Sequence, residues 1–478
     1  MLSPIAESDP ARAPHVLLSA YTVDPRRGSE PGVGCHWIGV HLAAGCRVTA
    51  VVHRDRGGGV EHTAACYDEA LRSGRLRLIA IAPGWLSRAL KALPGAWYAA
   101  YRAWQRQVAT AARAAVALDP PDWIHHLSLN SYREPGYLYH LGLPVVWGPI
   151  GGVQDADPRL VRLQGGRARA AEAVRTAINR WCAAYAPAPR AARRAARVLL
   201  AANPEAEAWA RRGRQAVVRS LLETAVEMTD PPPSSSAGRA GVLWVGSDEA
   251  RKNPEFALLA HALLGRCLPG IGLTLVGLGA AREQELRAWA AQRELDLAGV
   301  RILARIPRAD LVALYRGARL FWFTSYRDTS GNVLLEAMAH GAVPVAFAQH
   351  GAAAILDQGA GELVTLAAPR AMLNDWVRRS RRLMCDERAW LAAAETAITR
   401  CERRYRWTGK WPALRLALLR AGVWPLPPAA SSPSSARMAP ANRPPSPLCA
   451  SVSSRAAPRS VPTTGGCPGS PPAATATW

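Results

Sequence analysis

FWFTSYRDTSGNVLLEAMAHGAVPVAF, residues 321–347, is the stretch from which the fold of this chain can be inferred. Its apolar start at residues 321–324 is typical of a buried strand, and residues 333–339 are typical of an apolar helix that ends before Gly341. Residues 344–347 then predict another strand. A strand, a turn, a helix and a strand in this order indicate a parallel sheet covered by helices.

The turn between this strand and helix holds small and polar residues. Ser330, Gly331 and Asn332 lie where the helix should begin, so their backbone N–H groups lack helical partners and, with the helix dipole, favour a bound phosphate. Asp328 precedes the turn and Glu336 lies about one helical turn inside. The two carboxylates could accept hydrogen bonds from a sugar and a ribose, with a diphosphate between them. An ordinary solvated loop is the alternative that this motif alone leaves open.

The same alternation of strands and helices occurs on both sides of a segment rich in Pro and Ser, residues 230–240. Before it, a strand at 15–21, a glycine-rich loop at 23–34, a helix at 35–44 and a strand at 47–52 form a βαβ opening. Further strands are expected at residues 76–81, 123–127, 144–147, 198–201, 242–246, 273–277, 300–303 and 320–324.

This pattern predicts an α/β protein with two domains and a ligand site in the cleft between them. The expected organisation is a first domain at residues 1–229, a linker at 230–240, a second domain at 241–405, a terminal helix at 406–426 that returns to the first domain, and a tail at 427–478. The tail is dominated by Pro, Ser and Ala, which predicts disorder.

Length and composition exclude several classes of protein. The chain has 478 residues, 49% of them hydrophobic, and no run of about twenty apolar residues that could span a membrane. Residues 1–14 carry acidic residues and prolines in place of the basic and apolar parts of a signal peptide, so a cytoplasmic location is expected, and the inner face of the membrane is kept open as a place within it. Nine scattered cysteines indicate neither a disulfide framework nor a zinc site.

The formal charge of +23 favours an anionic partner. Residues 159–219 contain fourteen arginines and three glutamates, which suggests an acidic membrane face or a phosphorylated lipid; solvated helix faces are the alternative. No nucleic-acid-binding module is recognisable, so no nucleic-acid partner is expected. Residues 85–107 predict an interfacial helix pair or helices packed on the first sheet, because apolar side chains recur every three or four positions between basic ones.

Several segments, taken in order, resemble the glycosyltransferases of family 4. They are GSEPGVG at residues 28–34, DWIHH at 122–126, LPVVWGPIGG at 143–152, the pairs at 245–246 and 251–252, and residues 328–345. The resemblance runs from about residue 16 to residue 411. It implies the GT-B architecture of two facing Rossmann-like domains, and transfer of a sugar from a nucleoside-diphosphate donor to a glycan or lipid-linked acceptor with retention of configuration.

The resemblance also assigns roles in the second domain. Glu336 would bind the ribose hydroxyls and Asp328 the hydroxyls of the transferred sugar, while the backbone N–H groups of Ser330, Gly331 and Asn332 would bind the diphosphate. In this way the two carboxylates and the turn between them would form the donor site. Neither a cofactor nor a metal ion is expected, since the nucleoside-diphosphate sugar is a co-substrate and the developing phosphate charge would be stabilised by the protein itself.

Further implied contacts come from both domains. Lys252 would add a positive charge beside the phosphates, with Arg251 in place of an arginine that the family carries closer to the preceding glycine. Gly32 and Gly34 would let the first-domain loop close over the same phosphates.

A histidine of the first domain would face the sugar, and the sequence leaves the choice between His125 and His126 open.

Two departures from the family pattern keep other functions open. Ser247 stands where many members carry an arginine, and Asp328 is one methylene shorter than the usual glutamate. A nucleotide-sugar-binding protein with weakened catalysis is therefore one alternative, and a nucleotide-sugar epimerase on the same fold is another.

Overall fold

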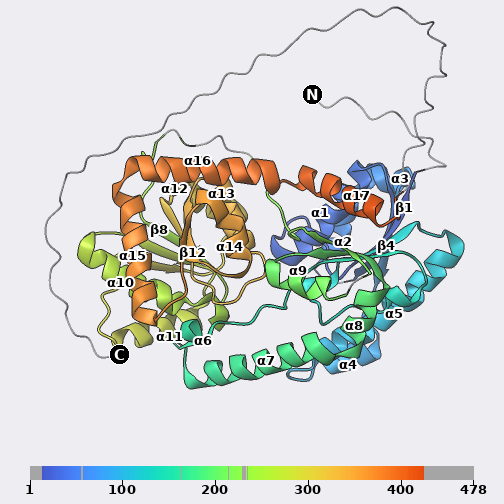
Figure 1. The fold of residues 1–478 in the computed structure, drawn as a ribbon, viewed down its shortest axis with the longest axis horizontal. Coiled ribbons are helices and arrows are strands. Elements are labelled where there is room, and N and C mark those ends of the chain that lie inside the picture. The colour runs from blue at the N-terminus through green and yellow to red at the C-terminus, as the bar shows by residue number, and fades with distance from the viewer. Residues whose placement is uncertain are drawn as a thin grey trace, which may run out of the picture. The chain divides into compact units, whose positions relative to one another are not determined.

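The computed structural model describes residues 13–54, 57–162, 164–213, 215–228, 233 and 235–424. It confirms two α/β domains, each built on a parallel sheet with helices packed against it (Figure 1). The predicted tail at 427–478 and residues 230–232 and 234 of the predicted linker lie outside the described residues.

The first sheet has the strand order β3-β2-β1-β4-β5-β6-β7, and its paired strands are parallel. Strands β1 and β4 at its centre are buried along their whole length, as expected for short apolar runs between two layers of helices. The strands are β1 (His15–Ala20), β2 (Arg47–His53), β3 (Leu76–Ile81), β4 (Trp123–His126), β5 (Val145–Ile150), β6 (Ala196–Ala201) and β7 (Val217–Ser220).

The helices of the first domain connect these strands. They are α1 (Ser29–Ala43), α2 (Gly59–Cys66), α3 (Asp68–Arg72), α4 (Trp85–Lys91), α5 (Trp97–Leu118), α6 (Pro158–Val161), α7 (Gly166–Tyr185), α8 (Pro187–Ala195) and α9 (Pro204–Arg211). Helix α1 begins six residues before the expected start, so the prediction of a loop up to residue 34 was wrong. Pro31 lies in the first helical turn, where its missing N–H group has no cost.

The second sheet has the order β10-β9-β8-β11-β12-β13 and is also parallel. Its strands are β8 (Val242–Val245), β9 (Leu273–Val276), β10 (Val300–Leu303), β11 (Leu320–Phe323), β12 (Val343–Phe347) and β13 (Glu362–Val364). Its helices are α10 (Pro254–Cys267), α11 (Ala280–Ala291), α12 (Arg308–Gly317), α13 (Asn332–Ala339), α14 (His350–Leu356), α15 (Pro369–Cys385) and α16 (Glu387–Arg404).

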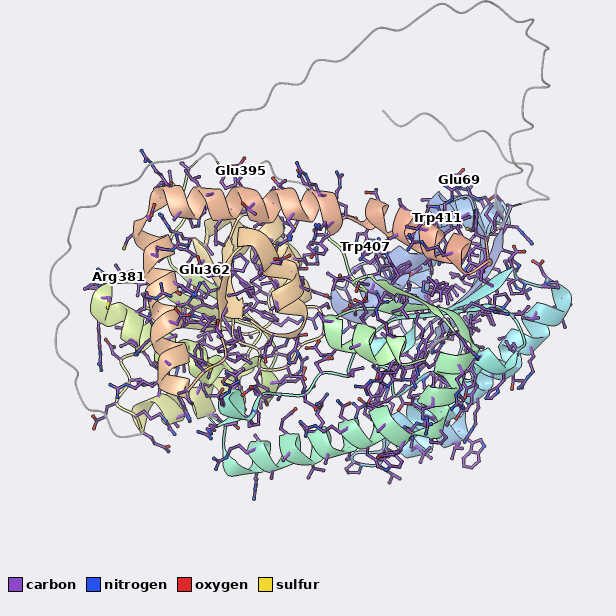
Figure 2. All side chains as sticks on the ribbon, viewed as in Figure 1. Glu69, Glu362, Arg381, Glu395, Trp407 and Trp411 are labelled. Atoms are coloured by element: carbon purple, nitrogen blue, oxygen red, sulfur yellow. The ribbon has the colours of Figure 1, made fainter. Side chains whose placement is uncertain are left out.

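After α16 the chain continues to α17 (Lys410–Arg420), whose apolar face belongs to the core of the first sheet (Figure 1). Leu414 and Leu418 are fully buried there. The connecting turn, in which Figure 2 labels Trp407, also packs on this domain, because Trp407 stacks on His36 with 4.5 Å between ring centroids. Helix α17 therefore completes the core of a domain that began some 390 residues earlier in the chain.

The predicted apolar stripe at residues 85–107 divides into two parts. Tyr101 and Trp104 are buried against the first sheet, as one of the two alternatives proposed. Trp85 and Leu93, in contrast, are 75% and 57% exposed. Across the described ranges, no helix combines the length and the apolar character needed to cross a bilayer.

Candidate functional site

The turn after β11 positions the carboxylate motif. Thr324 donates from its hydroxyl to the carbonyl oxygen of Lys252 (2.8 Å) and accepts from the indole N–H of Trp244 (2.8 Å), which ties the strand end to the segment after β8. Gly331 then adopts a left-handed conformation (φ 73°) before α13, where a Cβ would lie 3.0 Å from the Phe323 ring. Glycine is required at this turn for both reasons.

Asp328 lies at the centre of a cation–carboxylate cluster. Its Oδ2 accepts from the Lys252 ammonium and, at 3.2 Å, from Arg251 Nη1, while its Oδ1 accepts from the backbone N–H of Thr329 (3.0 Å). Burial alone would raise the pKa of Asp328, but the charges of Lys252 and Arg251 outweigh it and lower the pKa. Lys252, expected at a phosphate, and Asp328, expected at a sugar, therefore contact each other in this structure.

The residues before Lys252 explain how Arg251 reaches the turn. The Arg251 guanidinium forms ion pairs with Glu249 (2.7 Å) and with Asp328. Burial lowers the pKa of Arg251, but the two carboxylates outweigh this effect and raise it. Asp248 accepts from the backbone N–H of Gly279 (2.9 Å) at the start of α11. Of the three residues where the sequence departs from the family pattern, Glu249 contacts Arg251 directly and Ser247 donates to Glu249 Oε1 (3.1 Å), whereas Asp248 contacts the start of α11.

Glu336 projects from α13, one turn after its start. Its Oε1 accepts from Arg308 (3.1 Å) and its Oε2 from the Tyr315 hydroxyl (3.3 Å), and the side chain keeps 20% exposure. Burial, together with the charge of Glu336, raises the pKa of Tyr315 well above its usual value, so Tyr315 acts as a donor. Neither Arg308 nor Tyr315 was predicted from the sequence, since both come from α12 and approach Glu336 only through packing.

Ser330 connects the turn to the first domain. Its hydroxyl donates to Oε1 of Glu223, a residue that follows β7 and is only 9% exposed. Burial raises the pKa of Glu223, and the hydrogen bond from Ser330 opposes this shift. The Lys410 ammonium lies close to this pair and donates to the carbonyl oxygen of Leu222 (2.6 Å); its burial lowers the pKa of Lys410 to about 7.

Other first-domain side chains also hold the turn. Gln154 donates to the Thr329 hydroxyl (2.9 Å), and Arg327, which precedes Asp328, forms an ion pair with Glu172 of α7 (2.9 Å). Asn203 donates to the Thr329 carbonyl oxygen (3.3 Å). The turn is therefore fixed by both domains.

A cavity of about 180 Å³ lies between the start of α1, the segment after β4, and the start of α13. Glu30, Glu223 and Asn332 are among the residues that line it. Glu30 keeps an exposed surface, but partial burial of its carboxylate, together with the nearby charge of Glu223, raises the pKa of Glu30 to about 7, although the Leu129 N–H donates to this carboxylate. Glu30 lies within a segment that the sequence singled out, but its role there was not predicted.

Two glycines in the first part of α1, Gly32 and Gly34, differ in their relation to this cavity. Gly34 lines it, and a Cβ on Gly34 would lie 2.2 Å from the carbonyl oxygen of Thr22. Gly32 instead packs on its own segment. A Cβ on Gly32 would lie 2.2 Å from the carbonyl oxygen of Arg27.

The predicted histidines do not line the cavity. His125 is fully buried, with Nε2 at 2.8 Å from the carbonyl oxygen of Gly148 and Nδ1 at 2.9 Å from His41 Nε2. His126 is 2% exposed and lies beside Gly136. Burial lowers the pKa of each histidine to about 4, so both are neutral at pH 7. Within the described part of the chain, moreover, no group of three or more His, Cys, Asp or Glu residues could hold a metal ion.

Comparison with known proteins places the turn in a recognised family domain. Residues 239–386 match the family described as Glycosyl transferases group 1. A D-inositol 3-phosphate glycosyltransferase of Corynebacterium kroppenstedtii is 29% identical over 168 residues, which is 34% of this chain and 36% of that protein. The chain thus aligns with about a third of that relative's length, and the match supports a glycosyltransferase.

Solved structures with the same two-domain fold cover nearly the whole described chain. Sucrose-phosphate synthase from Thermosynechococcus elongatus superposes with a TM-score of 0.56 at 18% identity, covering 86% of this chain and 99% of that chain. Anabaena HepE, solved in complex with UDP and glucose, gives a TM-score of 0.51 at 16% identity, covering 85% and 99%. At these identities the likeness establishes the fold.

Proposed function

We propose that this protein transfers a sugar from a nucleoside-diphosphate donor to a hydroxyl of a glycan or lipid-linked acceptor, with retention of configuration and without a metal ion. The observation that carries the proposal is the cluster of Lys252, Arg251 and Asp328 at the start of α13, with Glu336 one helical turn further on. All four residues lie inside the segment that matches the glycosyltransferase family.

The basic pair is suited to a departing diphosphate. Cleavage of the bond between the sugar and the diphosphate leaves negative charge on a phosphate oxygen, and this charge is larger in the transition state than in the bound donor. Lys252 and Arg251 stabilise it from one side, and the N–H groups of Ser330, Gly331 and Asn332 stabilise it from the start of α13. On donor binding the two cations would shift from Asp328 toward the phosphates.

The carboxylates then serve hydroxyl groups. Asp328, once partly released by the cations, would accept hydrogen bonds from the transferred sugar. Glu336 would accept from the ribose, while Arg308 and Tyr315 hold its carboxylate in one orientation. Because His125 is hydrogen bonded at both ring nitrogens and His126 is buried away from the cavity, we assign neither to the sugar.

Retention would follow if the acceptor attacks from the face that the diphosphate leaves. The bond from the acceptor oxygen to the anomeric carbon then forms where the bond to the phosphate oxygen breaks, and the leaving phosphate takes the acceptor's proton. This route needs no nucleophile from the protein and no metal ion.

A panel of nucleoside-diphosphate sugars tests the proposal by nucleotide release from purified protein. Glu336→Gln should lower kcat/KM for the accepted donor by about 10- to 100-fold, since a bidentate contact to the ribose is lost. Glu395→Gln, an exposed position on α16, is the matched control and should not change it (Figure 2). Equal activity in both variants, or release from no donor, would contradict the proposal; binding of a nucleotide sugar without release or transfer would favour the weakened binding protein.

We further propose that an anionic membrane is a partner of the first domain. Exposed apolar side chains recur along one face of α7, where Val174, Ile178, Trp181 and Tyr185 are each at least half exposed. Trp85 of α4 is exposed as well. Residues 85–118 contain five basic residues and no acidic one, so the charge around these side chains complements an anionic surface.

Cosedimentation with vesicles tests this contact. The protein should bind vesicles that contain phosphatidylglycerol and not vesicles of phosphatidylcholine alone, and binding should weaken as salt rises. Trp181→Ser combined with Trp85→Ser should lower the bound fraction several-fold, whereas Leu416→Ser on α17 should not. Binding that is indifferent to lipid charge and to the tryptophans would contradict the membrane proposal and leave the transferase proposal intact.

A further inference from the structure

The cavity beside α13 contains polar atoms that have no partner in the protein. Three of the buried side-chain atoms without a hydrogen bond line it: Thr22 Oγ1, Asn130 Oδ1 and Glu223 Oε2. A buried polar atom without a partner destabilises the protein, because its hydrogen bonds to water are lost and not replaced. Three of them around one cavity make it a polar site, in which solvent or the hydroxyl groups of a ligand would supply the partners.

The chemistry of these atoms restricts that ligand. An amide oxygen and a carboxylate oxygen accept hydrogen bonds, and a threonine hydroxyl both accepts and donates. Glu30 adds a second carboxylate to the wall. Hydroxyl groups match such a wall in any protonation state, because each can donate and accept.

The charge of the wall excludes another class of ligand. None of the described residues that line the cavity is basic, and two are glutamates. Lys252 and Arg251, the nearest cations of the donor site, are paired with Asp328 and do not line the cavity. A phosphate group here would meet like charge in a partly enclosed space, at a cost of several-fold to many-fold in affinity.

The backbone around the cavity is held in an unusual conformation. Leu129 and Asn130 both have positive φ angles, 57° and 36°, which are uncommon in residues other than glycine. This conformation directs the Leu129 N–H to Glu30 and leaves the Asn130 side chain on the cavity wall. Strain of this kind is often found at ligand sites.

The size of the cavity limits what can enter. A volume of about 180 Å³ corresponds to roughly six water molecules at about 30 Å³ each. One sugar or cyclitol ring is of this order, whereas a complete nucleotide sugar is larger.

We infer that this cavity binds one uncharged, hydroxyl-rich ring and rejects the same ring when the part that enters the cavity carries a phosphate group, with Thr22, Asn130 and Glu223 as its hydrogen-bond acceptors. The inference deepens the proposed function and rests on it for the source of the ring, which is the transferred sugar of the donor or the acceptor. It also distinguishes this protein from its curated relative, which is named for an inositol phosphate.

Equilibrium dialysis tests the binding directly at pH 8, which lies above the raised pKa of about 7 for Glu30. The probes are labelled glucose beside glucose 6-phosphate, and labelled myo-inositol beside its monophosphate, with UDP present to occupy the nucleotide site. At least one ring should bind saturably, and its monophosphate should bind at least about tenfold more weakly. Equal or tighter binding of the phosphate, or no saturable binding of either ring, would overturn the inference.

Thr22→Val separates a binding role from a structural one. The two side chains have nearly the same shape, so removal of an unpartnered hydroxyl should leave the melting temperature unchanged or higher, while affinity for the ring falls about five- to tenfold. Thr110→Val, at an exposed position of α5, should change neither quantity. Glu30→Gln is the second variant, and ring affinity unchanged in both variants would also overturn the inference.

The same variants identify the source of the ring. If the ring is the transferred sugar, Thr22→Val should weaken binding of the nucleotide sugar and leave that of the bare nucleoside diphosphate unchanged. If the ring belongs to the acceptor, the dissociation constants of the nucleotide sugar and of the nucleoside diphosphate should both be unchanged, and KM for the acceptor should rise. Turnover with every constant unchanged would overturn this inference and leave the proposed function standing. If no donor is turned over, the proposed function fails, and the dialysis result decides this inference alone.

Discussion

The turn at Asp328 and the wall of the neighbouring cavity treat buried polar groups in opposite ways. Around Asp328 the carboxylate has two cations and a backbone N–H, so its charge is balanced without a ligand. Along the cavity, Thr22, Asn130 and Glu223 each leave an atom without a partner. The carboxylate of the first region has its partners within the protein, whereas the polar atoms of the second region find partners only among molecules that enter the cavity.

This difference separates two tasks of binding. A balanced cluster keeps its side chains in place before the donor arrives, but the donor must then compete with an existing ion pair. An unbalanced wall costs stability in the free protein and returns that cost when a hydroxyl-bearing ring binds. Strong electrostatic binding and selective hydrogen bonding are thus placed in adjacent but distinct sets of residues.

The largest effect is expected from breaking the balanced cluster. Lys252→Met removes the cation that contacts Asp328 most closely and should lower the rate of nucleotide release by about 10²- to 10³-fold, since charge on the leaving diphosphate loses a fixed partner. Steady-state release assays measure this, with Lys91→Met on the exposed face of α4 as the control. A loss no greater than that of the control would show that the cluster is only structural.

A smaller effect should follow from breaking the cavity wall. Gly34→Ala places a Cβ 2.2 Å from the carbonyl oxygen of Thr22, so the wall must shift at a cost of about 1–3 kcal/mol in the free energy of unfolding. Gly265→Ala in α10, where a Cβ meets nothing within 4 Å, should instead stabilise the protein by about 0.5–1 kcal/mol. Urea denaturation compares the two, and equal stability of both variants would contradict the close packing of α1.

The smallest expected effect is on the pH dependence of stability, to which Asp328 and Glu30 contribute in opposite directions. The pKa of Asp328 is lowered in the folded protein, so its contribution to stability is present above the unfolded pKa and is lost as pH falls through the folded value. The pKa of Glu30 is raised from 4.5 to about 7, so the folded state binds the proton more tightly and stability falls as pH rises from about 4.5 to 7.

Melting temperatures of two variants between pH 4 and 8 check these opposite directions. Glu30→Gln should melt higher than the parent protein at pH 8, with the advantage shrinking toward pH 4.5. Asp328→Asn should melt lower at pH 8, with its deficit shrinking toward acid. Parallel curves for the two variants would show that their surroundings do not differ in the way described.

The sequence predicted those parts of the molecule that are local in the chain. Apolar periodicity identified both sheets, and the turn with Asp328 and Glu336 was visible because strand, glycine and helix follow one another within residues 321–347. Lys252 was singled out as a phosphate contact because it follows a strand that ends in glycine. Its pairing with Asp328 was not, since this contact joins residues 76 positions apart.

The parts that were missed depend on packing between distant segments. Glu223 follows a short edge strand with no recognisable motif, yet it reaches Ser330 across the two domains. Tyr315 and Arg308 come to Glu336 from the preceding helix. The early start of helix α1 was missed because its glycines suggested a loop. In the structure these glycines allow close contact between the helix and neighbouring carbonyl groups.

The return of α17 to the first domain has a consequence for the order of events during synthesis. The core around β1 and β2 includes Leu414, Ala417 and Leu418. Lys410 donates a hydrogen bond to the carbonyl oxygen of Leu222, the residue before Glu223. These residues leave the ribosome after the whole second domain. The domain made first is therefore finished last, and a chain truncated after Arg404 should remain open to proteolysis in its first half while its second half resists.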